Sequence, residues 1–365
     1  MPDRDDSIQE RAQMNTIEPR LTDSNADTTP TTIQDIRSQP AVWQSTLVTL
    51  NENDHYLREC LQETDKAEAV LTGCGTSYYL PLTAASFYTR FARGRARGVP
   101  ASDIITFPET VFAADQDYLL VAISRSGKTP ETIDAARYVK EVLGGRTSAI
   151  SCTPDSLLSR MCDQTIVAPA AQEQGRFMTK SYTTMLLVWQ FLVAHKAGND
   201  TLAQELSMLP QHAARILREF EPQLEKLARE GHFTQYIYLG QGPFYGLAAE
   251  SMLKIKEMAC TCSEAYHSME LMHGPKYAVD DKTLVTLLLS DTAREQEMQV
   301  LQKIKGFRAS TKVICESASP EIAGTANYLI ELRSGLSEHA RLLLYMLVTQ
   351  LYGYHRAVAL GKKVD

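Results

Sequence analysis

Two short segments of the sequence combine glycine with hydroxyl side chains, a composition suited to holding a phosphate group. One is Ser124-Arg125-Ser126-Gly127-Lys128-Thr129 and the other is Gly73-Cys74-Gly75-Thr76-Ser77. Each follows a short apolar run and precedes a helical pattern, so each is expected at a strand-to-helix turn. A helix N-terminus there offers free N–H groups and a partial positive charge to an anion. Taken alone, the first segment is explained nearly as well by a simple N-cap at Thr129.

Neither segment has the pattern of a nucleotide-binding loop. No Gly-Lys-Ser/Thr sequence follows Gly73, as a Walker A loop requires. The third glycine of a dinucleotide-binding turn is also missing. Two hydroxyl-bearing turns in one region therefore favour a small phosphorylated ligand over a nucleotide.

The second half of the sequence contributes charged side chains that could move a proton. Glu250, Lys254 and Glu257 stand at i, i+4 and i+7, which places them on one stripe of a helix. Their neighbours are largely apolar, so the helix is expected to be buried and the charges to face a polar cavity. A carboxylate beside a lysine in such a cavity is an acid–base pair. On an exposed helix, the same stripe would be an ion-pair ladder worth about 0.2–0.5 kcal/mol per pair.

A further candidate is the histidine of His273-Gly274-Pro275. A histidine directly before Gly-Pro lies on a constrained loop, and its imidazole can donate or accept a proton near neutral pH. The alternative is a structural or surface histidine, since this residue type is often half-buried without a role. The remaining histidines have no partner that the sequence reveals.

The spacing of these segments predicts a parallel α/β fold that occurs twice. Eight short apolar runs alternate with helical patterns, which indicates parallel strands covered by helices on both faces. The runs are 69–72, 118–123, 148–150, 164–167, 236–239, 284–289, 312–315 and 328–330. Three landmarks of the first half recur in the second half after 164 to 167 residues. Such a shared offset indicates two copies of one unit. The landmark pairs are Gly73 and Gly240, Ser124 and Ser290, and Ile150 and Ile314.

We expect a tail and two units along the chain. Residues 1–32 are rich in Asp, Asn, Thr and Pro, which predicts a disordered tail. The first unit covers residues 33–205 and begins with a helix that contains Trp43. The second unit covers residues 206–365 and is entered through a helical stretch over 201–228. Its turns carry fewer hydroxyls, so the first unit is expected to hold the phosphate and the second to supply the acid–base groups.

The composition excludes several functional classes. Of 365 residues, 44% are hydrophobic and 22% charged, as in ordinary globular proteins. A net charge of −7 argues against binding to nucleic acid or to an anionic membrane. No apolar run reaches the ~18–20 residues of a membrane span, and the acidic N-terminus is not a secretory signal. The seven cysteines are scattered and form no CxxC pair, and Cys260 and Cys262 lie in a helical pattern. This arrangement predicts reduced, mostly buried thiols in a cytoplasmic protein, and no metal site.

The motifs described above, taken together and in their order along the chain, resemble those of the sugar isomerase (SIS) family. The resemblance covers about residues 65–365. The resemblance implies two tandem SIS domains, each a parallel sheet flanked by helices in a flavodoxin-like three-layer arrangement. The acid–base helix and the His-Gly-Pro loop are similar to the isomerase half of glucosamine-6-phosphate synthase and to stand-alone amino-sugar-phosphate deaminases. The matched pieces are Gly73 to Ser77, Ser124 to Thr129, Met161-Cys162-Asp163, Met178-Thr179-Lys180, Glu250-x3-Lys254-x2-Glu257 and His273-Gly274-Pro275.

The resemblance also implies residue roles in opening the ring of a hexose or hexosamine 6-phosphate and moving a proton between C1 and C2. Glu257 is implied as the base and His273 as the group that opens the ring. In the family the histidine loop reaches a neighbouring subunit's site, so a homodimer is expected. Lys254 and Glu250 would line the pocket and stabilise the developing charge, without a metal or other cofactor. The implied phosphate ligands are Thr76, Ser77, Ser124, Arg125, Ser126 and Thr129.

The sequence departs from the synthases in ways that affect the expected reaction. It shows no N-terminal glutaminase segment, and it stops at Asp365 without the synthases' lysine-bearing tail. Arg125 and Met178 replace a glutamine and a small hydroxyl residue. We therefore expect a deaminase that converts glucosamine 6-phosphate to fructose 6-phosphate and ammonia. The alternatives are a galactosamine/tagatose-type or glycated-amine 6-phosphate isomerase or deglycase, the isomerising subunit of a synthase, and a non-catalytic sugar-phosphate sensor.

Overall fold

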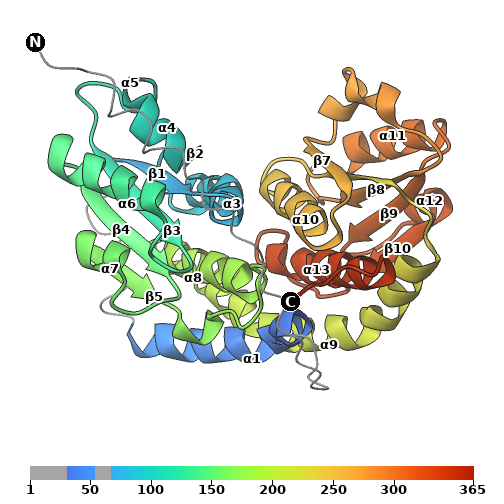
Figure 1. Ribbon diagram of the computed structural model, residues 1–365, viewed down its shortest axis with the longest axis horizontal. Coiled ribbons are helices and arrows are strands. Elements are labelled where there is room, and N and C mark those ends of the chain that lie inside the picture. Colours follow the sequence, from blue (N-terminus) through green and yellow to red (C-terminus); the bar gives the residue numbers. More distant parts are fainter. Residues whose placement is uncertain (1–30, 54–66) are drawn as a thin grey trace, which may run out of the picture.

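A computed structural model describes residues 31–53 and 67–365 and contains two parallel five-stranded sheets with helices on both faces (Figure 1). The strand orders are β2-β1-β3-β4-β5 and β7-β6-β8-β9-β10, so corresponding strands occupy corresponding places. The strands are β1 (Glu68–Gly73), β2 (Ala96–Pro100), β3 (Tyr118–Ser124), β4 (Arg146–Ser151), β5 (Gln164–Val167), β6 (Gln235–Leu239), β7 (Cys262–Tyr266), β8 (Thr283–Leu288), β9 (Ser310–Cys315) and β10 (Tyr328–Glu331).

Helices connect these strands. In the first half they are α1 (Thr31–Glu52), α3 (Thr76–Phe91), α4 (Ala101–Thr106), α5 (Pro108–Val111), α6 (Pro130–Arg137), η2 (Tyr138–Val142), α7 (Leu157–Met161), η3 (Pro169–Ala171) and α8 (Lys180–Lys196). In the second half they are α9 (Asp200–Glu230), α10 (Phe244–Ala259), η4 (Glu270–Met272), η5 (Pro275–Ala278), α11 (Arg294–Lys305), α12 (Pro320–Thr325) and α13 (Leu342–Ala359). Of these helices, α3, α8, α10 and α13 contribute to the core between the two sheets.

Successive side chains of a strand point to opposite faces of the sheet, so alternate residues belong to different hydrophobic cores. In β3, Leu119, Val121 and Ile123 face one way and join a core that runs through α3, α8, α10 and α13 to the second sheet. Leu120 and Ala122 face a separate core beneath α4 and α6. The two units therefore share one continuous apolar core, and each has a smaller core on its outer side.

All eight strands expected from apolar runs are present, and the structure adds the edge strands β2 and β7. These two have no continuous apolar run because their sequences, ARGVP and CSEAY, are largely polar or carry glycine and proline, whereas the edge strands β5 and β10 keep such a run. The expectation that Cys260 and Cys262 lie in a helix was wrong. Helix α10 ends at Ala259, Cys260 adopts a left-handed φ of 53°, and Cys262 begins β7. Both of these thiols are exposed, whereas Cys152, Cys162 and Cys315 are buried.

The N-terminal helix α1 lies along both units and packs on α8, α9 and α13 (Figure 1). The predicted helix that contains Trp43 is present, and Trp43 is fully buried. Of the predicted tail, residues 1–30 lie outside the described residues. Thr31 and Thr32, however, are the first residues of α1 and not part of a tail, because the carboxylate of Asp365 accepts hydrogen bonds from both.

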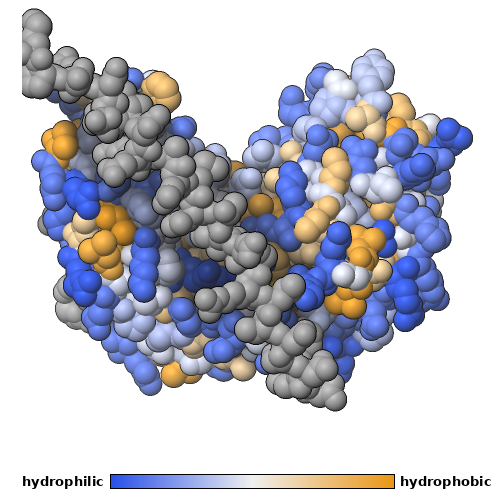
Figure 2. Space-filling model, in the orientation of Figure 1, coloured by the Kyte–Doolittle hydropathy of each residue, from blue (hydrophilic) through white to orange (hydrophobic). Residues whose placement is uncertain are grey.

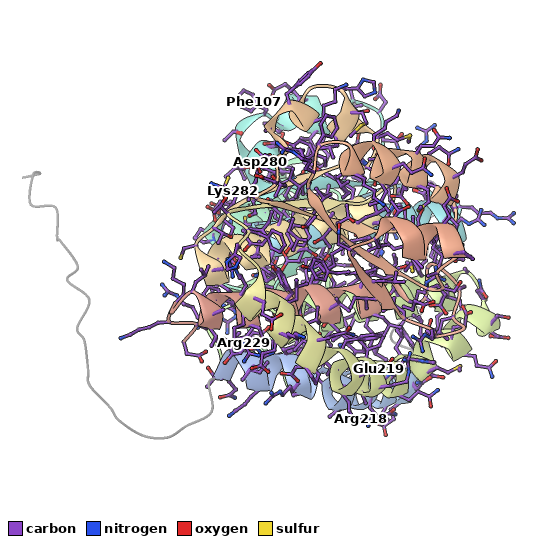
Figure 3. All side chains as sticks on the ribbon, turned by 90° about the vertical axis from the view of Figure 1, so that its right-hand side faces the viewer. Phe107, Arg218, Glu219, Arg229, Asp280 and Lys282 are labelled. Carbon is purple, nitrogen blue, oxygen red and sulfur yellow. The ribbon has the colours of Figure 1, made fainter. Side chains whose placement is uncertain are left out.

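Helix α9 connects the two units, in agreement with the predicted helix over 201–228. Its apolar stripe packs on α8, α1 and α13, while Arg218, Glu219 and Arg229 lie on its outer side (Figure 3). The predicted boundary between residues 205 and 206 falls inside this helix, so the described chain has no loop at that point.

The surface view shows two lobes with a hollow between them (Figure 2). Apolar side chains on the visible faces are scattered among polar ones and do not form one large patch. Within residues 31–53 and 67–365, no helix is both long and apolar enough to cross a membrane.

Candidate functional site

The hydroxyl-rich segment after β3 forms a tight turn at the carboxyl edge of the first sheet, as predicted. Ser124 is 2% exposed, and its Oγ lies 3.1 Å from Thr129 Oγ1 and accepts the N–H of Gly127 at 3.1 Å. Gly127 has φ +59°, and a Cβ there would lie 2.1 Å from Ser156 Oγ, so only glycine fits. The turn thus brings together three of the six predicted phosphate ligands: Ser124, Ser126 and Thr129.

The turn after β1 places two further predicted ligands beside the first turn, because β1 and β3 are paired neighbours. Thr76 and Ser77 open helix α3 and are 5% and 6% exposed. A Cβ on Gly73 would lie 2.3 Å from Ser77 O, so this glycine lets the helix begin directly on the strand. Parallel neighbours end at the same sheet edge, which is where ligands of such folds bind.

Arg125, the sixth predicted ligand, has its main chain held by the next strand. Its carbonyl accepts the N–H of Cys152 at 3.1 Å and the hydroxyl of Thr153 at 3.2 Å. The guanidinium is half-buried, and its Nη1 is buried without a hydrogen-bond partner among the described residues. An unsatisfied buried N–H donor costs free energy, and an anion at this turn would satisfy it.

The predicted acid–base stripe lies on α10, and the structure brings it to Thr76. Lys254 Nζ lies 2.6 Å from Glu257 Oε2 and 3.4 Å from Glu250 Oε1. Thr76 accepts a hydrogen bond from Lys254 at 3.2 Å and donates one to Glu250 at 3.2 Å. The acid–base helix of the second unit and the hydroxyl turn of the first unit therefore meet in one site.

Burial and mutual attraction determine the charges of this cluster. Glu250 and Lys254 are fully buried, whereas 36% of the Glu257 side chain is exposed. Burial raises the pKa of Glu250 to about 7 although Lys254 opposes this shift. For Lys254, burial lowers the pKa but the two glutamates outweigh it, so the pKa is raised and the lysine is charged at neutral pH. Of the two glutamates beside Lys254, only Glu257 is accessible to solvent.

A glycine allows α3 and α10 to approach closely enough for these contacts. A Cβ on Gly246 would lie 2.5 Å from Thr83 Oγ1 and 2.7 Å from Tyr79 O. The Thr83 hydroxyl also donates to the carbonyl of Pro243 at 2.8 Å, directly before α10. The sequence analysis did not single out Gly246, because its importance depends on which helix crosses α10.

His273 makes no side-chain contact with the acid–base cluster of its own chain. It lies between η4 and η5 on an exposed loop, and no hydrogen bond, ion pair or ring contact joins it to Glu257. His267, for which the sequence suggests no role, is half-buried and stacks on Tyr245 at a centroid distance of 3.9 Å. Burial lowers the pKa of His267, so it is neutral at pH 7.

The corresponding turn of the second unit is filled by a carboxylate of the same chain. Glu338 accepts the N–H groups of Asp291 and Thr292 at 2.6 and 3.2 Å, and the Thr292 hydroxyl at 2.6 Å. These residues lie 166 positions after Arg125 and Ser126. No described carboxylate occupies that turn in the first unit. The second unit therefore shows a carboxylate bound by two main-chain N–H groups and one hydroxyl of such a turn.

No group of three or more His, Cys, Asp or Glu side chains in the described ranges is arranged to hold a metal ion. The cluster on α10 offers acid–base and electrostatic groups.

Comparison with known families identifies the first unit. Residues 64–195 match the family described as SIS domain. This region is a SIS domain. The resemblance inferred from the hydroxyl turns is thereby confirmed for the range that contains both of them. The SIS domain includes the first sheet from β1 to β5 and helices α3 to α8.

Curated relatives extend the similarity beyond the SIS domain. The glutamine–fructose-6-phosphate aminotransferase [isomerizing] of Helicobacter pylori is 30% identical over 310 residues, which are 82% of this chain and 50% of that protein. The enzyme of the same name from Pseudomonas aeruginosa is 30% identical over 355 residues, 91% of this chain and 56% of that protein. This chain thus spans about half the length of these relatives.

Solved structures match nearly the whole described fold. Tagatose-6-phosphate ketose/aldose isomerase from Escherichia coli has a TM-score of 0.84 and 23% identity, with 94% of this chain and 96% of that chain covered. Glucosamine-6-phosphate deaminase from Thermotoga maritima has a TM-score of 0.73 and 25% identity, with 92% and 96% covered. The first match, at this identity, establishes similarity of fold.

Proposed function

We propose that the protein is a sugar-phosphate isomerase of the aldose–ketose type, and that its second unit is a further SIS domain. The observation that carries this proposal is the meeting of Thr76 with Glu250 and Lys254, which joins a phosphate-type turn to an acid–base pair. The matching strand order of the two sheets supports the second part. The relatives named for reactions of hexose 6-phosphates support the first part.

Within this class we propose deamination of glucosamine 6-phosphate as the reaction. After ring opening, Glu257 would move the C2 proton to C1 while O1 gains a proton and the amino group loses one, which converts the 2-amino aldehyde into a 1-hydroxy-2-imine. Water then hydrolyses the imine to fructose 6-phosphate and ammonia. Lys254, charged and 2.6 Å from Glu257, would stabilise the negative charge that develops on O1 during the proton transfer. The match to a deaminase at 25% identity supports this choice.

The phosphate would lie on the turn Ser124–Thr129 with Thr76 and Ser77 at its side. The carboxylate bound in the equivalent turn of the second unit supports this placement, since carboxylate and phosphate use the same N–H and hydroxyl donors. The unpartnered Nη1 of Arg125 adds a positive charge there.

The second candidate is the synthetic direction, in which fructose 6-phosphate accepts ammonia. The 30% identity to isomerizing aminotransferases over 82% of this chain favours it. Both candidates use the same carbon chemistry, and only the supply of ammonia separates them.

One panel of assays tests both candidates. Glucosamine, galactosamine, fructose and tagatose 6-phosphates are incubated with the protein, with and without ammonium, and ammonia and sugar products are quantified. We expect ammonia and fructose 6-phosphate from glucosamine 6-phosphate, with kcat lowered about 10²- to 10⁴-fold by Glu257→Gln. Because Glu257 is partly exposed, this variant should fold normally. Interconversion of tagatose 6-phosphate without ammonia release would contradict the deaminase proposal, and ligand binding without turnover would indicate a sensor.

We also propose a cytoplasmic homodimer in which His273 acts in the partner's site, as the exposed position of its loop permits. Mixing the inactive variants Glu257→Gln and His273→Ala tests this arrangement. If His273 acts between subunits, mixed dimers contain one intact site and regain activity. If the mixture stays inactive although mixed dimers form, the histidine acts within its own chain, and if His273→Ala alone is fully active, the histidine has no role in the reaction.

A further inference from the structure

Asp35 of α1 makes a buried junction with the segment that leads into α8. Its Oδ1 lies 2.9 Å from Lys180 Nζ, and the two side chains are 2% and 9% exposed. Its Oδ2 accepts the main-chain N–H groups of Gln174 and Gly175 at 2.9 and 2.6 Å. One carboxylate outside the SIS domain therefore holds three positions of the chain between residues 174 and 180.

The segment 172–179 lies directly on α1. A Cβ on Gly175 would be 2.7 Å from Thr32 Oγ1 and 3.1 Å from Asp35 Oδ2, so any side chain there would push the segment away. Thr32 is itself held by Asp365, whose Oδ1 accepts its N–H at 3.0 Å and its hydroxyl at 2.7 Å. The start of α1 is thus fixed on one side by the segment after α13 and on the other by segment 172–179.

A second set of buried hydrogen bonds joins α1 to the end of the same segment. The Gln350 amide of α13 donates to the carbonyl of Thr179 at 3.2 Å. Gln39 of α1 donates to Gln350 at 2.8 Å and accepts the hydroxyl of Thr183 at 2.7 Å. Segment 172–179 is consequently tied to both α1 and the second unit by groups that water does not reach.

The segment lies between the two parts of the proposed site. At its start, the Thr153 hydroxyl lies 3.2 Å from both Gln172 Oε1 and the carbonyl of Arg125 in the phosphate turn. Beyond its end, Tyr182 is fully buried near Glu250 of the acid–base helix, whose charge adds to burial in raising the tyrosine pKa. A displacement of this segment would therefore alter contacts both at the Ser124–Thr129 turn and at the acid–base helix.

We propose that α1 positions segment 172–179 for the sugar phosphate and that Asp35 is the positioning residue. The proposal rests on the proposed function, because it takes the Ser124–Thr129 turn as the phosphate site and Glu257 as the base. Without the Asp35 carboxylate, two main-chain N–H groups and the Lys180 ammonium would be buried without their partner. The segment would then move outward to hydrate them, and a displacement of about 1 Å can cost about a hundredfold in rate.

The test compares Asp35→Asn with Arg37→Ala in the full-length protein. Arg37 lies on the same helix, but its side chain is 52% exposed and pairs with Glu221 of α9, away from the segment. We expect Asp35→Asn to lower kcat/KM for glucosamine 6-phosphate by about ten- to a hundredfold. We also expect faster amide hydrogen exchange at Gln174 and Gly175 and weaker binding of fructose 6-phosphate. Arg37→Ala should change none of these quantities, and Asp35→Glu should recover part of the loss.

The outcomes separate positioning from general stability. A lower melting temperature with unchanged kcat/KM and unchanged exchange at Gln174 would show a merely structural role and overturn the proposal. If Asp35→Asn does not fold, the double variant Asp35→Asn with Lys180→Met removes both charges and is expected to show the same loss of kcat/KM. If the wild type turns over no sugar phosphate, the proposed function fails, and fructose 6-phosphate affinity then decides: equal affinity in wild type and variant overturns the role of Asp35.

Discussion

Glu250 and Lys312 are both fully buried ionisable residues, but only Glu250 has polar partners. Glu250 faces Lys254 and Thr76 at the interface of the two units. Lys312 lies on β9 with its Nζ 3.6 Å from the ring centroid of Tyr352, and its Nζ has no hydrogen-bond partner among the described residues. Partnered buried charges at a sheet edge serve the proposed chemistry, whereas Lys312 lowers the stability of the second unit.

We therefore predict that Lys312→Met stabilises the protein. Burial lowers the pKa of Lys312 to about 7 from 10.5, so between these values the unfolded chain binds a proton that the folded chain lacks. The free energy of unfolding of the wild type should rise with pH between pH 7 and 10.5. Below pH 7 the destabilisation caused by burying Lys312 should be complete. At about 1.4 kcal/mol per pKa unit the cost is of the order of several kcal/mol, partly offset by the cation–π contact.

Denaturant unfolding between pH 6 and 10 measures this effect. The variant should gain stability at pH 7 and lose the rise with pH that Lys312 causes. Lys303→Met, at an exposed position of α11, is the control and should change neither quantity. A Lys312→Met protein that is less stable than wild type throughout this pH range would show that the lysine makes a net favourable contribution.

At the scale of elements, the crossing of α3 and α10 assembles the site. Helix α3 starts at the hydroxyl turn of the first unit, and α10 carries the acid–base stripe of the second. Their contact places Thr76 within hydrogen-bond distance of Glu250 and Lys254. The distance between α3 and α10 therefore determines both how these helices pack and whether Thr76 contacts the acid–base pair.

Two helical glycines test this crossing. Gly246→Ala should lower stability by about 1–3 kcal/mol and lower kcat/KM, because its Cβ would force α10 away from α3. A Cβ on Gly353 in α13 would have no neighbour closer than 3.7 Å. Gly353→Ala should therefore raise the free energy of unfolding by about 0.5–1 kcal/mol through helix propensity, without loss of activity. Thermal unfolding and steady-state kinetics of both variants measure these effects. A Gly246→Ala enzyme with wild-type stability and kcat/KM would show that the crossing tolerates a wider separation.

At the scale of the whole molecule, two units of equal strand order have unequal turns. Glu338 fills the turn after β8 in the second unit, whereas no described carboxylate occupies the equivalent hydroxyl turn of the first unit. A carboxylate that is covalently part of the chain competes with phosphate at very high effective concentration. We therefore infer a structural role for the second turn and a single phosphate site, on the first turn, within the described part of the chain.

We accordingly predict a binding stoichiometry of one phosphate ester per chain. Ser126→Ala should weaken fructose 6-phosphate binding about tenfold or more, since it removes a hydroxyl donor to a charged group. Thr292→Ala, the equivalent change 166 positions later, should leave the affinity unchanged. Isothermal titration calorimetry of both variants provides the comparison. Two sites in the wild type, or equal losses in the two variants, would contradict the assignment of the ligand to the first turn.

Much of the architecture was predictable from the sequence because it depends on local patterns. Buried parallel strands require continuous apolar runs, and eight of the ten strands were expected on that basis. The strands β2 and β7 were missed because their sequences, ARGVP and CSEAY, lack an apolar run, which the other edge strands β5 and β10 retain. The hydroxyl turns and the stripe of Glu250, Lys254 and Glu257 were found because both depend on residues close together in sequence.

The tertiary structure alone decided which of these parts meet. Thr76 and Glu250 are 174 residues apart, and only the crossing of α3 and α10 brings their oxygens to 3.2 Å. The role proposed for Asp35 has the same origin, since its partner Lys180 lies in another helix. Sequence determined the chemical groups and the local turns that present them, because these follow from short-range sterics and periodicity. Their assembly into one site depended on long-range packing, which no local pattern encodes.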